Sequence, residues 1–282
     1  MNDRKWILPL LAGIAICAAT SIAWPQTLRE QPDPQQLIVA GSGVNLGITR
    51  LLAKAFMNDH PQIIIEVPGS IGTKGAIAAV ADGAITFGLL ARSLKENEES
   101  SGLVVRPYAR VPIVVGVHPT VADDESTFQD LVDIYRGTKT RWKDGNEIIV
   151  LAREPGDSGM QVLEKKVPGF LEAYAESART KRWSIFFTDQ DANRALSITH
   201  YAIGISDLGM LATENLNVKV LKLNGIAPTP ENLLDGRYPL SRDLSFLYRA
   251  GTLPEGAKAF LDFVRSDKGA GILRSHGYIP VN

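Results

Sequence analysis

Near its N-terminal end the chain has a strand-like run that breaks into a glycine-rich turn and then into a helical pattern, and this pattern limits the folds it can adopt. The apolar run at 37–40 ends at the Gly-Ser-Gly turn of 41–43, and apolar residues then recur at helical spacing as far as Phe56. Asn45 is the expected N-cap of this helix. Because the first N–H groups of a helix have no partner within it, such a turn is a ready anion site.

The same device recurs twice more, as Gly-Ser-Ile-Gly-Thr-Lys-Gly at 69–75 and as Arg-Glu-Pro-Gly-Asp-Ser-Gly at 153–159. Each turn stands before a helical pattern, so each offers unpaired N–H groups. We infer that the three turns meet around one small ligand.

Strand-like runs alternate with helical patterns along most of the chain, which predicts an α/β fold with mainly parallel sheets. Strands are expected at 37–41, 62–67, 84–90, 103–117, 147–152, 201–206, 218–222 and 240–248. Helices are expected at 45–56, 73–82, 127–136, 157–166, 171–182, 191–198, 254–265 and 267–275. Pro107 and Pro112 are expected to divide the long strand at 103–117.

Composition removes several classes of function. The chain has 282 residues with 30 Lys+Arg against 31 Asp+Glu and carries no basic run, so nucleic-acid binding is not expected. The one cysteine, Cys17, lies in the N-terminal apolar segment, which excludes cysteine sites from the folded body. The four histidines are scattered without metal-ligand spacing, so neither a metal nor a cofactor is expected.

The N-terminus reads as a targeting segment. Arg4 and Lys5 precede the uncharged apolar run at 6–23, and small residues there allow a cut before Trp24. We therefore expect a signal peptide at 1–23 and a tether at 24–36, with the body in the periplasm. An uncleaved inner-membrane anchor is the first alternative, and lipid attachment at Cys17 is the second.

Several stretches, in order, resemble one family, the periplasmic solute-binding proteins of ABC transporters of the phosphate-binding subunit type. The matching stretches are 40–43, 69–75, 82–88, 133–137 with 141–142, 153–159, 238–242, 256–266 and 277–280. The resemblance covers nearly the whole body. It implies a two-lobed periplasmic-binding-protein fold with the ligand cleft between the lobes. Lobe 1 would comprise 37–112 and 223–282, and lobe 2 would comprise 113–222.

The resemblance also implies a set of ligand contacts at the three turns. Arg153 would grip two oxygens of an oxyanion through its planar fork. Lys74 is alternatively a solvated residue of the first helical turn, and Arg153 alternatively a structural partner of Glu154 or Asp157. The ligand-binding residues so implied are Ser42, Gly43, Val44, Thr73, Lys74, Gly75, Arg153, Ser158 and Gly159.

One position departs from the family. Phosphate binders place an Asp after the strand at 84–90, where this chain has Ala91 followed by Arg92. A carboxylate there accepts the hydrogen bond that hydrogen phosphate donates, and it repels fully ionised sulfate. Asp157 is a candidate for the missing acceptor. Arg92 either changes the selectivity or points to solvent or to Glu96.

These observations predict an exported, non-enzymatic protein that captures a small oxyanion, phosphate first, for an ABC transporter permease. A monomer is expected. One alternative keeps the fold but assigns molybdate, sulfate or a small organic anion as the ligand. Another is a ligand-free module for signalling or structure, tethered to the membrane. An enzyme has no support beyond polar residues in a cleft, which a binding protein also needs.

Overall fold

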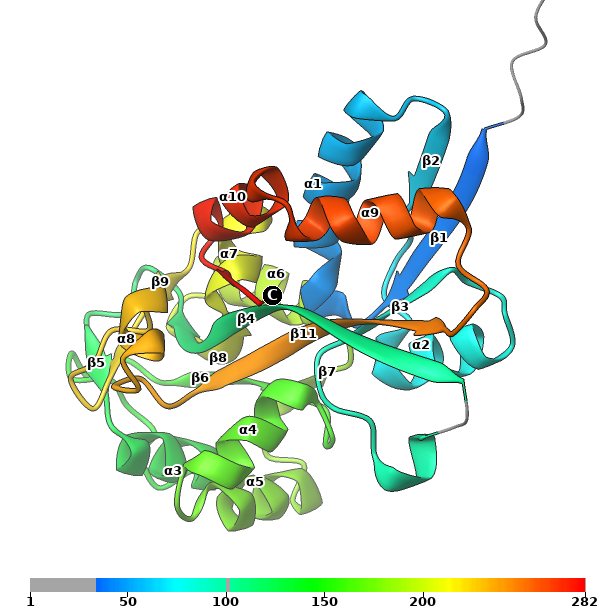
Figure 1. The fold of residues 1–282 in the computed structure, drawn as a ribbon. Coiled ribbons are helices and arrows are strands. Elements are labelled where there is room, and N and C mark those ends of the chain that lie inside the picture. The colour runs from blue at the N-terminus through cyan, green and yellow to red at the C-terminus, as the bar shows by residue number, and fades with distance from the viewer. Residues whose placement is uncertain (1–33, 100–101, 282) are drawn as a thin grey trace, which may run out of the picture. The chain divides into compact units, whose positions relative to one another are not determined.

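The computed structural model of the chain describes residues 34–99 and 102–281, in which strands and helices alternate (Figure 1). The strands are β1 (Gln35–Gly41), β2 (Ile63–Glu66), β3 (Phe87–Leu90), β4 (Leu103–Val117), β5 (Glu125–Ser126), β6 (Ile149–Arg153), β7 (Ser184–Phe186), β8 (Ala202–Asp207), β9 (Lys219–Val220), β10 (Lys222–Leu223), β11 (Ser241–Arg249) and β12 (Ile279–Pro280). The helices are α1 (Gly43–Asp59), α2 (Gly72–Ala81), α3 (Phe128–Arg136), α4 (Ser158–Lys166), α5 (Phe170–Arg179), α6 (Asp189–Ile198), α7 (Leu208–Thr213), α8 (Pro230–Leu234), α9 (Glu255–Arg265) and α10 (Asp267–Ser275), with a 3₁₀ turn at Glu96–Glu98. Within this part of the chain, no helix combines the length and apolarity that crossing a bilayer requires.

Two sets of parallel strands form the ends of the main sheet. At one end β1 pairs in parallel with β2 and β3, and at the other β6 pairs in parallel with β7 and β8. The expected parallel strands are therefore present in both halves. β7 was not expected from the sequence, because its three residues are too few to show a period.

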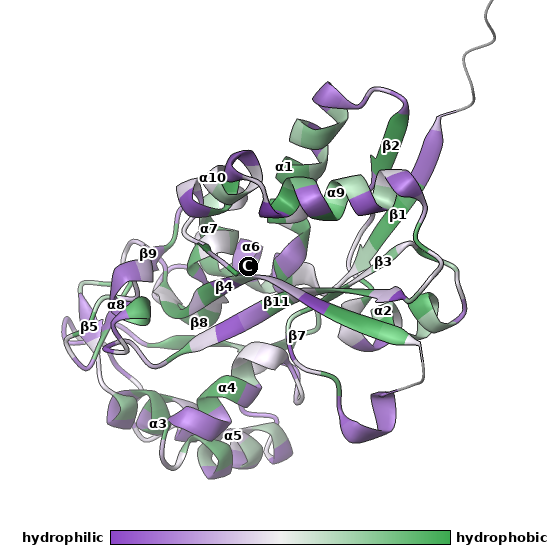
Figure 2. Cartoon of the chain, in the orientation of Figure 1, coloured by the Kyte–Doolittle hydropathy of each residue, from purple (hydrophilic) through white to green (hydrophobic). Residues whose placement is uncertain are grey.

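The first strand begins inside the predicted tether. Gln35 and Gln36 pair with Ile63 and Ile64 of β2, so the tether cannot extend to residue 36. The N–H of Gln35 also donates to the carbonyl of Gln62. Figure 2 shows why the sequence misplaced this boundary: β1 starts with hydrophilic residues and becomes apolar only afterwards. The predicted signal peptide at 1–23 lies outside the described residues.

β4 and β11 are antiparallel neighbours that connect the two halves (Figure 1). β4 pairs with β11 along its first part and with β8 along its last five residues. The expected division of this strand by its prolines is wrong. It is continuous and absorbs Pro107 with a register shift opposite Leu244 and Ser245, as expected for a residue without an N–H to donate.

Two large apolar cores lie on either side of the point where β4 crosses. The first contains Phe56, Phe246 and Phe260 among its buried side chains, and the second contains Tyr135 and Phe170. Residues 223, 238 and 240 pack into the second core, so the return to the first half comes later than position 223. We propose that lobe 1 comprises 34–112 and 241–281 and that lobe 2 comprises 113–240. α7 lies at the boundary, since its Met210 packs into the first core.

The N-cap prediction for α1 was wrong. Ser42 has the extended N-cap conformation and α1 begins at Gly43. Asn45 is fully buried instead: its side-chain amide donates to the Leu90 carbonyl and its oxygen accepts from the Tyr108 hydroxyl at 2.7 Å. Asn45 therefore ties the start of α1 to β3 and β4.

Candidate functional site

A cavity of about 300 Å³ lies where α1, α2, α4 and α6 begin, and we call it the junction cavity. The residues that line it are Ser42, Gly43, Ser70, Ile71, Gly72, Thr73, Lys74, Arg92, Lys95, Arg153, Glu154, Pro155, Gly156, Asp157, Ser158, Gln161, Phe187 and Asp189. Residues from all three predicted turns are present. The inference that these turns meet is therefore confirmed by their position in the structure.

The two turns of lobe 1 are held together by the carbonyl of Gly41. That oxygen accepts hydrogen bonds from the N–H of Ile71 at 3.0 Å and from the hydroxyl of Ser70 at 3.1 Å. Neither α1 nor α2 has a side-chain cap. Among the described residues, no acceptor meets the N–H of Gly43 or of Thr73. Lobe 1 thus presents open helix starts to the cavity.

Arg153, at the end of β6, is the buried cation of the lobe 2 side, with only 5% of its surface exposed. Its Nη1 donates to the Phe186 carbonyl at 2.7 Å, and its Nη2 lies 3.1 Å from Asp157 Oδ2 and 3.5 Å from Asp189 Oδ1. Its Nε has no partner among the described residues. Arg153 is therefore both a structural ion-pair partner and a residue of the cavity wall, so the two readings of the sequence are not exclusive.

Asp157, the candidate for the missing acceptor, lines the cavity but already makes three hydrogen bonds. Its Oδ1 accepts from the N–H groups of Gly159 and Met160, as an N-cap of α4, and its Oδ2 accepts from Arg153. The N–H of Gly159 is consequently engaged as well, and Gly159 is not part of the cavity lining. Ser158 does line the cavity and remains a candidate ligand contact.

Asp189 was missed because α6 begins two residues earlier than predicted. The capping pair of Thr188 and Asp191, which marks a helix start, would have revealed it. A Cβ atom on Gly43 would lie 2.6 Å from Asp189 Oδ2 and 2.7 Å from Gln190 Oε1, so only glycine leaves room for α6. Burial, together with the nearby Asp157 carboxylate, raises the pKa of Asp189.

A second buried arginine, Arg242, stands behind the cavity wall and was not predicted as a site residue. It lies on β11 with 5% of its surface exposed. Its Nη1 donates to Ser158 Oγ at 2.8 Å, and its Nη2 lies 3.9 Å from Asp207 Oδ2. Burial raises the pKa of Asp207 to about 6, and the charge of Arg242 acts against this shift. The tertiary fold alone joins these residues, which are far apart in sequence.

Arg92 lines the cavity but is bound to its own loop. Its two terminal nitrogens donate to Glu98 at 2.6 and 2.8 Å, so the expected partner Glu96 was wrong. This interaction lowers the pKa of Glu98 to about 2.

Three other predicted positions do not line the cavity. Ala91 and the side chain of Val44 are buried in the first core, with 2% of their surfaces exposed. Gly75 lies further along α2, where a Cβ would meet only the side chain of Ile71. Of these three, Val44 keeps an N–H in the first turn of α1.

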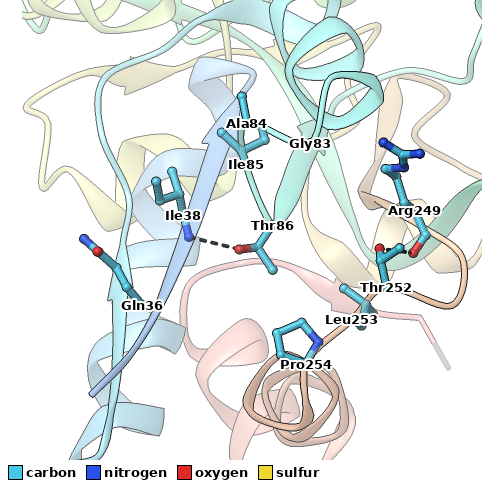
Figure 3. A pocket seen from close by; sticks show the side chains of 10 residues that line it. All are labelled: Gln36, Ile38, Gly83, Ala84, Ile85, Thr86, Arg249, Thr252, Leu253 and Pro254. Atoms are coloured by element: carbon cyan, nitrogen blue, oxygen red, sulfur yellow. Dashed lines mark hydrogen bonds between the residues drawn. The ribbon is translucent and has the colours of Figure 1, made fainter. Parts of the chain in front are cut away.

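A different cavity, of about 350 Å³, lies in lobe 1 beside β1 and the start of α9 (Figure 3). Its polar groups are already paired: Thr86 accepts from the N–H of Ile38, Thr252 donates to the Arg249 carbonyl, and Arg249 donates to the Ala81 carbonyl. Arg249 is its one charged lining residue. It lacks the converging donors of the junction cavity.

The described residues hold no group of three or more His, Cys, Asp or Glu side chains placed to bind a metal ion. The junction cavity offers N–H groups, hydroxyls and a buried guanidinium, which together suit an anion bound by hydrogen bonds.

Comparison with known proteins agrees with this geometry. A family model described as a PBP superfamily domain matches residues 29–268. The phosphate-binding protein PstS of Bacillus subtilis (strain 168) is 25% identical over 259 residues, covering 89% of this chain and 83% of that protein.

Solved structures agree as well. A Clostridium perfringens protein, described as a phosphate ABC transporter substrate-binding protein and solved with bound phosphate, gives a TM-score of 0.77 at 26% identity, covering 88% of this chain and all of that one. A phosphate transport receptor from Vibrio cholerae, at 20% identity and a TM-score of 0.62, shares the fold. The fold is the two-lobed α/β fold that the resemblance implied, and the chain belongs to the PBP superfamily.

Proposed function

We propose that this chain is a solute-binding protein that captures phosphate in the junction cavity and delivers it to an ABC transporter, without catalysing a reaction. The observation that carries the proposal is the meeting of three helix starts with the buried Arg153 in one cavity. The similarity to a structure with bound phosphate supports the choice of ligand.

The ligand would be held from both lobes. The open N–H groups at the starts of α1 and α2 would contact it from lobe 1, with Thr73 adding a hydroxyl. Ser158 and Arg153 would contact it from lobe 2. The contact of Arg153 with Asp189, at 3.5 Å, is the longest of its three side-chain contacts and is the one a ligand oxygen can replace.

Asp189 takes the role for which Asp157 was considered. No donor bonds to Asp189 Oδ2 among the described residues, so this oxygen is free to accept a hydrogen bond from the ligand. Hydrogen phosphate carries such a proton and sulfate at neutral pH does not. The proposal therefore includes selection of phosphate over sulfate by Asp189.

Calorimetric titration of the purified protein, unfolded and refolded to remove carried ligand, tests the proposal. We expect one-to-one binding of phosphate and weak binding of sulfate. Asp189→Asn should reduce the ratio of the two affinities, with Asp191→Asn on the same helix as the control. Absence of phosphate binding by the parent would overturn the assignment, and an unchanged ratio in Asp189→Asn would overturn the role of that residue.

A different oxyanion is the second candidate. Ala91, which follows β3, lies in the first core, so the cavity has no carboxylate at that position. Competition of molybdate, sulfate and small phosphonates against phosphate separates the two. Tighter binding of any of them would replace phosphate in the proposal.

The proposal also places the protein in the periplasm as a monomer that docks on a permease. N-terminal sequencing of the protein from intact cells checks the predicted cut before Trp24. A start at Met1 would favour the retained anchor.

A further inference from the structure

Ser158 has an unusual arrangement for a residue at the start of a helix. Its hydroxyl oxygen accepts from Arg242 Nη1 at 2.8 Å, and among the described residues that hydroxyl has no acceptor for its own hydrogen. A serine hydroxyl has one hydrogen to donate. Because the guanidinium cannot accept it, the hydrogen of Ser158 is left for another acceptor, and Ser158 lines the junction cavity.

Arg242 itself is a buried cation with few partners. Only 3% of its side chain is exposed, Nε has no partner among the described residues, and Asp207 is 3.9 Å from Nη2. Asp207 is fully buried and its Oδ2 accepts no hydrogen bond. Asp207 therefore compensates the charge of Arg242 only loosely, and that charge lies next to the start of α4 through the hydrogen bond to Ser158.

The first turn of α4 is shaped to let Arg242 approach. A Cβ on Gly159 would lie 2.9 Å from Arg242 Nη2 and 3.1 Å from Asp157 Oδ1. A side chain there would push the guanidinium away from the helix. The glycine at position 159 is therefore explained by the room that Arg242 needs. It is not explained by a contact with the ligand, since the N–H of Gly159 already donates to Asp157.

We propose that Arg242 is a positioning residue of the anion site: it holds Ser158 as a donor toward the ligand and adds positive charge behind the start of α4. This inference rests on the proposed function of the junction cavity. Arg242 acts through Ser158 and does not touch the ligand. Because Arg242 lies on β11, it also ties the site to one of the two strands that join the lobes.

A double-mutant cycle on phosphate affinity tests the proposal. Arg242→Met should weaken binding by about tenfold or more in the parent, since a hydrogen bond to a charged group is lost at the site. In the Ser158→Ala background the same change should weaken binding by less than about threefold. Gly159→Ala should reproduce part of the effect of Arg242→Met, because it displaces the guanidinium.

Arg242→Gln separates the two parts of the role, because glutamine can donate to Ser158 without a charge. It should bind phosphate better than Arg242→Met, and it also serves if the methionine variant does not fold. Arg110→Met is the matched control. Arg110 lies on β4 next to Val111, the residue opposite Arg242, and it pairs with the exposed Asp243. It should leave the affinity unchanged within about twofold.

The outcomes are distinguishable. If the parent binds no phosphate, the proposed function and this inference both fail. The parent could instead bind phosphate while Arg242→Met and Arg242→Gln each weaken that binding by the same factor in the parent and in the Ser158→Ala background. Arg242 would then be only structural, and this inference alone would be overturned.

Discussion

On the lobe 1 side of the junction cavity, α1 and α2 begin without side-chain caps, whereas on the lobe 2 side Asp157 caps α4 and Thr188 caps α6. The residues behind these helix starts differ as well. Asn45 supports α1 through neutral hydrogen bonds, but α4 rests on the buried arginines 153 and 242 and their carboxylates.

This difference indicates that the two lobes contribute different groups to the cavity. Lobe 1 contributes backbone N–H donors that are not capped by side chains, and neutral hydrogen bonds hold them in place. Lobe 2 offers charge that is already neutralised in part by its own carboxylates, so it is rigid but sensitive to protonation. We expect mutations on the lobe 2 side to cost more, and to depend more on pH, than mutations on the lobe 1 side.

The largest expected effect is that of Arg153→Met. It removes the cation that neutralises Asp157 and Asp189, so two buried carboxylates lose their partner. We expect the free energy of unfolding to fall by about 3–5 kcal/mol and phosphate binding to be lost. Urea unfolding and calorimetry measure these effects, and Arg153→Lys should recover part of the stability. A methionine variant that binds phosphate like the parent would contradict the comparison.

Asp207 should make the stability of the protein fall as the pH rises. Its pKa in the folded protein is raised to about 6, so the folded state holds a proton that the unfolded state releases above about pH 4. The stabilisation is complete below pH 4 and is lost as the pH rises through 6, by about 3 kcal/mol. Asp207→Asn should flatten this part of the profile.

Unfolding curves between pH 4 and 7 measure the slope. The exposed Asp243, which pairs with Arg110, provides the control Asp243→Asn, whose profile should follow that of the parent. If the profile of Asp207→Asn were as steep as that of the parent, protonation of Asp207 would not contribute to the pH dependence of stability.

Gly43→Ala tests the contact between the two sides. The added methyl group would meet Asp189 and Gln190, so we expect overpacking of about 1–3 kcal/mol and weaker phosphate binding. Gly75→Ala is the lobe 1 control, since its methyl group meets only Ile71, the N-cap residue of the same helix. Equal stability of the two variants would mean that α6 can move away from α1 without cost.

The smallest effect is expected for Lys74→Met on the lobe 1 side. Lys74 lines the cavity, but the described residues give it no ion-pair partner, so it acts as an exposed point charge. We expect phosphate binding to weaken by less than about fivefold, and less still at high salt. Titrations at two ionic strengths check this. A loss as large as that of Arg153→Met would invert the comparison of the two sides.

Much of the lobe 1 side could be predicted because its signals are local. The turns at 41–43 and 69–75 stand directly between a strand-like run and a helical pattern, and both line the cavity. The prediction for Asn45 failed because asparagine near the start of a helical pattern is a common N-cap residue, although Asn45 is the third residue of α1. Only the fold shows that it bonds to Leu90 and Tyr108 instead.

The lobe 2 side was predicted less well because its interactions join distant positions. Arg153 and Ser158 were found from one loop, but Asp189 and Arg242 come from other elements. No spacing rule links Arg242 to Ser158. Their hydrogen bond depends on how β11 crosses between the lobes, which is set by sheet pairing and not by neighbouring residues.

Local patterns in the chain were enough to predict the α/β alternation, the three glycine-rich helix starts and the candidate Arg153, because each depends on residues close in the chain. Which groups of the site are free and which are already bonded could be learned only from the folded structure. Both oxygens of Asp157 already accept hydrogen bonds, from the first turn of α4 and from Arg153, whereas Asp189 Oδ2 accepts none among the described residues. Hydrogen-bond capacity is shared among all groups that meet in space, so it becomes known only when the chain has folded.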